Sequence, residues 1–132
     1  MSFLEIKGIS KSFRGLKAVS SATFDVDRGS IVALIGPNGA GKTTCFNMIA
    51  GVFAPDAGSI AFQDKPIQGL RPDQVCAAGI GRTFQIVKPF AGLSVLDNVI
   101  VGALQREGSV SSARVFSLSI LKKLKLDAKK DL

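Results

Sequence analysis

An apolar segment, a glycine-rich loop and a helical pattern follow one another in the first half of the chain. The segment "SIVALIG" is apolar at both odd and even positions, which is typical of a strand buried on both faces of a parallel sheet. The stretch "KTTCFNMIAGVF" places Phe46, Ile49, Ala50 and Phe53 along one stripe of a helix. A buried strand that leads through a tight loop into a helix predicts an α/β protein.

The loop between that strand and that helix satisfies the pattern G-x-x-x-x-G-K-[ST] in full. Its glycines allow a tight turn in which N–H groups converge on phosphate oxygens, and the helix N-terminus adds a favourable dipole. We expect Lys42 to contact the β- and γ-phosphates, Thr43 to ligate Mg²⁺ and Thr44 to hydrogen-bond the α-phosphate. The candidate phosphate-binding residues are Gly36, Pro37, Asn38, Gly39, Ala40, Gly41, Lys42, Thr43 and Thr44. The loop therefore predicts a nucleoside triphosphate site.

Alternating polar and apolar residues precede the loop, which predicts an antiparallel β portion before the buried strand. "FLEIKGI" sets Phe3, Glu5 and Lys7 against Leu4 and Ile6, and "SSATFDVDRG" alternates in the same way. Further on, we expect strands at "SIAFQ" and "IGRTFQ", helices at "RPDQVCAAG" and "SVLDNVIVGAL", a loop at "REGSVSSARVFS" and a short amphipathic helix at the end. The second of these helices has a capping-box pattern, with Ser94 as N-cap and Asp97 three residues on.

The formal net charge of +7 is unevenly distributed along the 132 residues. The last twelve residues, "LKKLKLDAKKDL", contain five lysines and two aspartates, and no basic run is interleaved with aromatic residues. This pattern favours a solvated or membrane-proximal tail over nucleic-acid binding. Cys45 and Cys76 are isolated in apolar helical contexts and predict small core residues, and a chain without histidine is a poor candidate for a zinc site.

No apolar run approaches the roughly 18 residues of a membrane-spanning helix. The N-terminal "MSFLEIKG" carries a glutamate and a lysine where a signal peptide would need its apolar stretch. We therefore expect a cytosolic chain without a transmembrane segment.

The segment "GPNGAGKTT", with Ser10–Phe13 upstream and "GIGRTFQ" downstream, resembles the ATP-binding subunits of ABC transporters. The guanine-reading motif of GTPases is absent from the sequence. The resemblance implies that Phe13 stacks on adenine, as an aromatic ring face can. It also implies that Gln85 is the glutamine whose carbonyl reaches Mg²⁺ and links the nucleotide site to the membrane-spanning partner.

A finer resemblance, to the branched-chain amino acid subgroup of these importers, depends mainly on "GIGRTFQIVKPFAGLSVLDNVIVGAL". It implies an ABC ATPase-type P-loop core with an antiparallel β subdomain and, as cofactors, ATP and Mg²⁺. The implied partners are membrane-spanning subunits and a second ATP-binding subunit, at the inner face of the cell membrane. Residues 1–105 correspond to the N-terminal part of the domain, and residues 106–132 to the start of a helical subdomain or to a divergent basic tail.

Several parts that the family uses for hydrolysis are not found in the sequence. There is no apolar run ending in Asp-Glu (Walker B), no Leu-Ser-Gly-Gly-Gln signature and no histidine. The chain is therefore expected to hold nucleotide without a general base for its hydrolysis. Two other interpretations remain open: a non-hydrolysing nucleotide-binding or interaction module, and a truncated gene product without independent activity.

Overall fold

The computed structural model describes residues 2–37, 39, 41–84 and 86–132, which form two compact units, 1–82 and 83–132. The first unit is built around an antiparallel sheet. Its long hairpin consists of β1 (Ser2–Phe13) and β2 (Leu16–Asp27), and β3 (Ala57–Phe62) and the short β4 (Lys65–Pro66) continue the sheet in the order β2-β1-β3-β4. The helices of this unit are α1 (Lys42–Ile49) and α2 (Pro72–Ala78).

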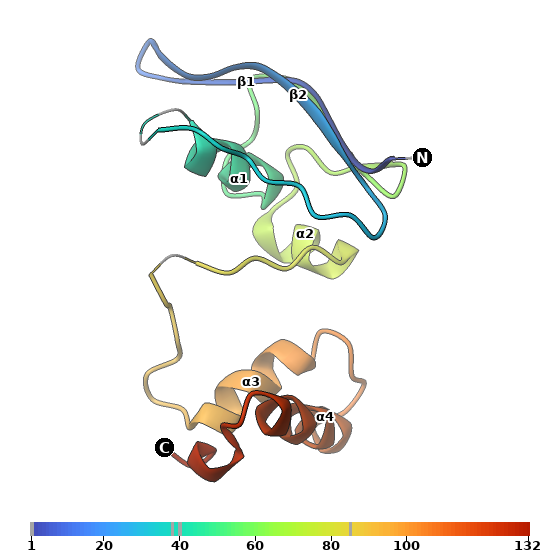
Figure 1. Ribbon diagram of the computed structural model, residues 1–132, viewed down its shortest axis with the longest axis vertical. Helices are drawn as coiled ribbons and strands as arrows, with labels where there is room; N and C mark the ends of the chain where they lie inside the picture. Colours follow the sequence, from blue (N-terminus) through green and yellow to red (C-terminus); the bar gives the residue numbers. More distant parts are fainter. Residues whose placement is uncertain (1, 38, 40, 85) are drawn as a thin grey trace. The chain divides into compact units, whose positions relative to one another are not determined.

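The predicted alternation is confirmed in β2 and at Ile6 and Lys7 of β1, but not at the start of β1, where Phe3 and Leu4 both pack against the same core. Ile6 is buried and Lys7 is exposed, and in β2 the half-buried Phe24 and Val26 alternate with exposed aspartates. The β1–β2 register shifts between Ile6 and Ile9, where Gly8 has a φ of 61°, so both isoleucines reach the same core. Figure 1 shows α1 beneath the hairpin.

The core of this unit joins the sheet to the inner side of α1. Ile6, Ile9 and Ile60 from the sheet form one cluster with Cys45 and Met48 of α1. The burial predicted for Cys45 is thus confirmed, whereas that predicted for Cys76 is wrong, because Cys76 lies on the exposed side of α2.

The expectation of a buried parallel strand at "SIVALIG" is wrong. Residues 30–37 form no strand, and Ile31 and Ile35 are 100% and 90% exposed. The physical reason is that the sheet of the described residues has no strand beside this segment, so its backbone has no ladder partner. The apolar sequence is that of a central strand, but burial requires neighbours on both sides.

The predicted helix after the loop is confirmed as α1, but its stripe differs from the prediction. Ile49 is buried as expected, whereas Phe46 is half exposed and Cys45 and Met48 face the core instead. The helix α2 begins with Pro72 and is followed by Gly79 in a left-handed conformation, as predicted. The strand predicted at "IGRTFQ" is not formed, since the described residues 80–84 have no regular structure.

The second unit is helical and consists of α3 (Val95–Ala103), α4 (Val110–Lys123) and a 3-10 turn, η1 (Asp127–Lys129). The predicted cap is confirmed, because the Ser94 hydroxyl accepts from the Asp97 N–H at 3.1 Å. The loop predicted at "REGSVSSARVFS" is wrong in its second half, where Ser109 caps α4. The core of this unit contains Leu96, Ile100, Ala103, Ala113 and Leu121.

Candidate nucleotide-binding site

The glycine-rich loop ends where α1 begins, and its last glycine lies against the sheet. Gly41 is the N-cap of α1 and has a φ of 90°. A Cβ placed on Gly41 would lie 2.4 Å from the Ala18 carbonyl oxygen and 3.1 Å from Val19 Cγ2, both in β2. Only glycine can adopt this left-handed backbone without strain and also leave room for the carbonyl of the neighbouring strand. The contact with β2 therefore fixes where α1 begins.

Lys42 is the first residue of α1 and spans the loop. Its side chain is half-buried and donates a hydrogen bond to the Gly36 carbonyl. The first turn of α1 contains no acidic residue, and among the described residues no side chain hydrogen-bonds at its N-cap. A helix N-terminus whose first-turn N–H groups have no capping side chain, beside an ammonium group, is suited to an anion. These residues fit a polyphosphate.

The remaining loop residues are placed as follows. Gly36 and Thr44 are half-buried, while Pro37, Gly39 and Thr43 are exposed. Thr43 follows Lys42 on the first turn of α1. Asn38, Ala40 and Gln85, three of the predicted site residues, lie outside the described residues.

Phe13 lies at the end of β1, directly before the turn of the hairpin. Its ring contacts that of Phe53 edge to face, with centroids 5.1 Å apart, and Lys11 Nζ lies 5.5 Å from its centroid. The side chain is 38% exposed, so part of the ring remains accessible. The packing with Phe53 also makes Phe13 part of the link between the hairpin and the segment that follows α1.

Asp56 forms a second link between those two segments, which sequence reasoning missed. Its carboxylate accepts from the Ser12 N–H at 2.8 Å and from Lys11 Nζ at 3.2 Å, and its own N–H donates to the Ser10 carbonyl at 2.8 Å. The Ser12 N–H, and after it Lys11, hold the pKa of Asp56 below its usual value. The "APDAG" turn pattern was visible in the sequence, but it contained no signal for this long-range contact.

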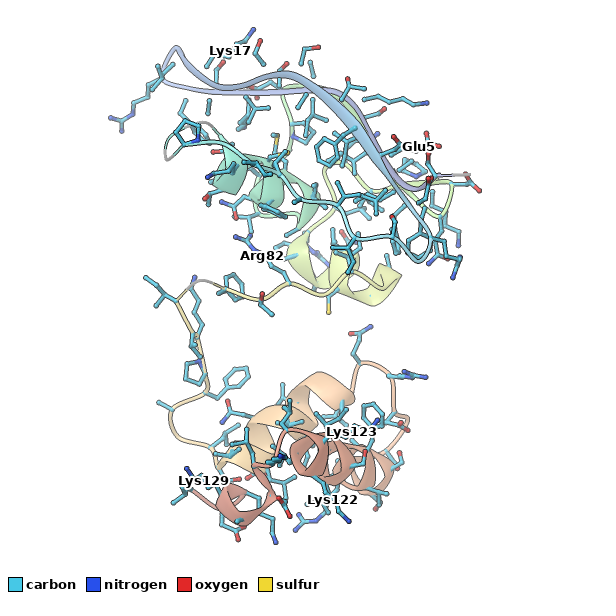
Figure 2. All side chains as sticks on the ribbon, in the orientation of Figure 1. Glu5, Lys17, Arg82, Lys122, Lys123 and Lys129 are labelled. Atoms are coloured by element: carbon cyan, nitrogen blue, oxygen red, sulfur yellow. The ribbon has the colours of Figure 1, made fainter. Side chains whose placement is uncertain are left out.

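Arg82 connects α1 to the segment that leads towards Gln85. Its guanidinium Nη1 donates to the side-chain carbonyl of Asn47, in the middle of α1. Figure 2 shows Arg82 between α1 and α2. Neither residue was singled out as a site residue, and the only signal was the place of Arg82 in the "GRTFQ" stretch.

The loop and its helix define a P-loop nucleotide-binding protein, and comparison with known proteins identifies the family. Residues 19–132 match the ABC transporter family. The chain is 41% identical over 101 residues to a probable branched-chain amino acid transport ATP-binding protein of Archaeoglobus fulgidus, covering 76% of this chain and 39% of that protein. It is 40% identical over 103 residues to a high-affinity branched-chain amino acid transport ATP-binding protein of Escherichia coli K12, and the match covers 78% of this chain and 40% of that protein.

Solved structures agree with this family. The chain superimposes with a TM-score of 0.81 and 30% identity on the ADP conformation of an ATP-binding cassette of an ABC transporter, covering 99% of this chain and 57% of that one. An ATP-binding cassette bound to ADP and Pi has the same fold, with a TM-score of 0.84 and 22% identity. The match covers 97% of this chain and 60% of that one.

The chain belongs to the ABC transporter family, and the resemblance inferred from its motifs is confirmed. The predicted ABC ATPase-type α/β fold is confirmed as well. The chain spans about 40% of the length of the transport ATP-binding proteins that it matches. No helix among the described residues is both long and apolar enough to cross a membrane. The division near residue 105 stays a prediction.

Proposed function

We propose that the chain binds ATP with Mg²⁺ at residues 36–44, as part of the ATP-binding subunit of an importer for branched-chain amino acids. The observation that carries the proposal is the N-terminus of α1, where Gly41 contacts β2 and Lys42 reaches back to Gly36. The names of the relatives support the substrate class. Membrane-spanning subunits and a second ATP-binding subunit are the partners that such a protein would need.

The roles of individual residues follow from their chemistry. Lys42 would neutralise the β- and γ-phosphates, and Thr44 would hydrogen-bond the α-phosphate. Mg²⁺ would supply charge neutralisation between phosphates, with Thr43 and Gln85 as its protein ligands. Within the described residues, no group of three acidic, cysteine or histidine side chains could hold a metal by itself, and phosphate oxygens and water would complete the Mg²⁺ shell.

We further propose that these 132 residues alone bind ATP without turning it over. The sequence contains no Asp-Glu pair behind an apolar run, no signature motif and no histidine. Hydrolysis would then require the Walker B, signature and histidine elements, which these 132 residues do not contain.

The test is a titration of the purified chain with a fluorescent ATP analogue in the presence of Mg²⁺. Lys42→Ala should weaken binding by about 10- to 100-fold, since a hydrogen bond to a charged group contributes about 1.5–3 kcal/mol. Lys65→Ala removes an exposed lysine from β4, at the far edge of the sheet from β2, and should leave affinity unchanged. Equal affinity of the Lys42→Ala variant and the unmodified chain would overturn the assignment. Steady ATP turnover that disappears with Lys42→Ala would overturn the claim that this chain lacks the hydrolytic part.

A further inference from the structure

Positive charge is concentrated at the end of the helical unit. Five lysines lie within nine residues, at the end of α4, in η1 and beside it, and we call them the C-terminal basic segment: Lys122, Lys123, Lys125, Lys129 and Lys130. Four of them are exposed and Lys130 is half-buried. Among the ion pairs of the described residues, none involves these lysines. Figure 2 shows Lys122, Lys123 and Lys129 on the last turn of α4 and the segment that follows it.

The C-terminal basic segment is held in place by backbone hydrogen bonds. The carbonyls of Lys130 and Leu132 accept from the N–H groups of Leu96 and Val95, at 2.9 and 3.0 Å. These two N–H groups belong to the first turn of α3, where the helix itself supplies no acceptor. The backbone of the C-terminal basic segment is therefore tied to α3, and four of its lysines are exposed, as expected for the solvated or membrane-proximal tail that the sequence predicts.

Lys125 occupies a backbone position that normally favours glycine. After α4 the Lys125 N–H donates to the Lys122 carbonyl and the Leu126 N–H to the Leu121 carbonyl, which is the Schellman pattern, and Lys125 has a φ of 59°. The ends of α1 and α2 show the same pair of hydrogen bonds with Gly51 and Gly79 at that position. At α4 alone among these three ends, the strained position carries a charged side chain.

Apolar side chains are exposed among these lysines. Leu124 is 61% exposed and Leu132 is 77% exposed, and Leu126 lies between them in the sequence with a smaller exposed fraction. Lysines surrounding exposed leucines are typical of surfaces that lie at a lipid–water interface, where the ammonium groups meet anionic headgroups and the leucines enter the acyl boundary.

We propose that the C-terminal basic segment, with Leu124 and Leu132, binds directly to the surface of an anionic lipid bilayer. Charge complementarity favours this partner, because segment 122–131 has five lysines against Asp127 and Asp131. Nucleic acid fits less well, since no aromatic residue follows Phe116 and exposed leucines gain nothing on a phosphate backbone. This contact goes beyond the proposed function, because it depends neither on nucleotide nor on membrane-spanning subunits.

The proposal is tested by co-sedimentation of the whole chain with phosphatidylcholine vesicles, with and without phosphatidylglycerol. We expect binding only to the anionic vesicles at low salt, and its loss at high salt because headgroup charges are screened. The triple variant Lys122→Gln, Lys123→Gln, Lys129→Gln should lower the partition coefficient about 100-fold, at roughly fivefold per lysine. Leu124→Gln should weaken binding further at any salt concentration.

The matched control is Lys7→Gln, Lys17→Gln, Lys65→Gln, which removes the same charge from exposed lysines of the sheet unit. It should retain vesicle binding. An equal loss in both triple variants, binding to pure phosphatidylcholine, or tighter binding to a DNA duplex than to anionic vesicles would overturn the proposal. Circular dichroism checks that each variant is folded. Lys42→Ala should leave vesicle binding intact, so failure of the nucleotide site is distinguished from failure of the lipid surface.

Discussion

The rings of Phe13 and Phe53 meet edge to face, with centroids 5.1 Å apart and planes inclined by 68°. One ring ends the first strand and the other follows the P-loop helix, so the pair joins two segments 40 positions apart in the sequence. The contact uses part of Phe13 and leaves 38% of the residue exposed. Phe13 thus has a packing role that is independent of any nucleotide.

If Phe13 also stacks on adenine, Phe13→Ala should weaken nucleotide binding by about tenfold, within the 1–3 kcal/mol range of base–aromatic stacking. Phe13→Trp should retain affinity, since it keeps a ring face. Phe53→Leu removes the edge-to-face partner but keeps the Phe13 ring. Its effect on affinity therefore reports the loss of Phe13–Phe53 packing without the loss of stacking on adenine. Titration with a fluorescent ATP analogue measures all three. Equal losses in Phe13→Ala and Phe53→Leu would assign Phe13 to packing alone.

Gly41→Ala should destabilise the sheet unit by about 2–4 kcal/mol, for two reasons. The new Cβ clashes with the Ala18 carbonyl, and the alanine must hold a left-handed backbone conformation. Gly29 has a φ of 77° but has open space around its Cβ position. Gly29→Ala therefore isolates the backbone strain and should cost about 1 kcal/mol. Urea unfolding measures both variants, and equal free-energy losses would contradict the importance of the β2 contact.

The Asp56 carboxylate should make stability depend on pH. Since its pKa is lowered in the folded chain, its contribution is fully present above the pKa of the unfolded chain, about 4. The contribution is lost as pH falls through the lower folded pKa. Asp56→Asn should therefore lower the melting temperature at neutral pH, and the difference should vanish at acidic pH.

Asp27→Asn is the charge-matched control for Asp56→Asn. Within the described residues, no hydrogen bond to the Asp27 side chain is found, and the residue ends β2 on the exposed side. The control variant should follow the melting curve of the unmodified chain at each pH. A melting-temperature difference for Asp56→Asn that stays constant as the pH is lowered through the acidic range would contradict the assignment.

Lys125→Gly should stabilise the helical unit by about 1 kcal/mol, because glycine adopts a positive φ without steric cost. Lys123→Gly, two residues earlier at the last position of α4, should instead destabilise, by at most about 0.5–1 kcal/mol. Both variants lose one lysine, so charge is matched between them. We expect the melting temperature of the helical unit to rise in Lys125→Gly and to fall in Lys123→Gly. Shifts of the same sign would contradict the left-handed conformation of Lys125.

Ile31→Thr should reduce self-association with little change in stability, since the Ile31 side chain is fully exposed on an unpaired apolar segment. Ile60→Thr places a hydroxyl in the core and should destabilise the sheet unit by at least 2 kcal/mol. Light scattering against concentration measures the first effect, and urea unfolding the second. Unchanged scattering for Ile31→Thr would show that this segment does not drive association.

The sequence alone determined the features that depend on local chemistry. The pattern of residues 36–43 predicted a loop followed by a helix, and that helix is α1. Ser94 marked the start of α3, and alternation marked β2 and part of β1, because caps and one-sided burial are set by neighbouring residues. The family resemblance followed from the same local motifs.

Only the tertiary structure decided which segments find a partner. The segment "SIVALIG" has the sequence of a buried strand, yet no strand of the described residues pairs with it, and burial requires neighbouring strands. The contacts of Asp56 with β1, of Arg82 with Asn47, and of Lys130 and Leu132 with the first turn of α3 each join distant residues. Local sequence sets the preference of each element, but long-range contacts need a geometry that exists only once the elements have packed.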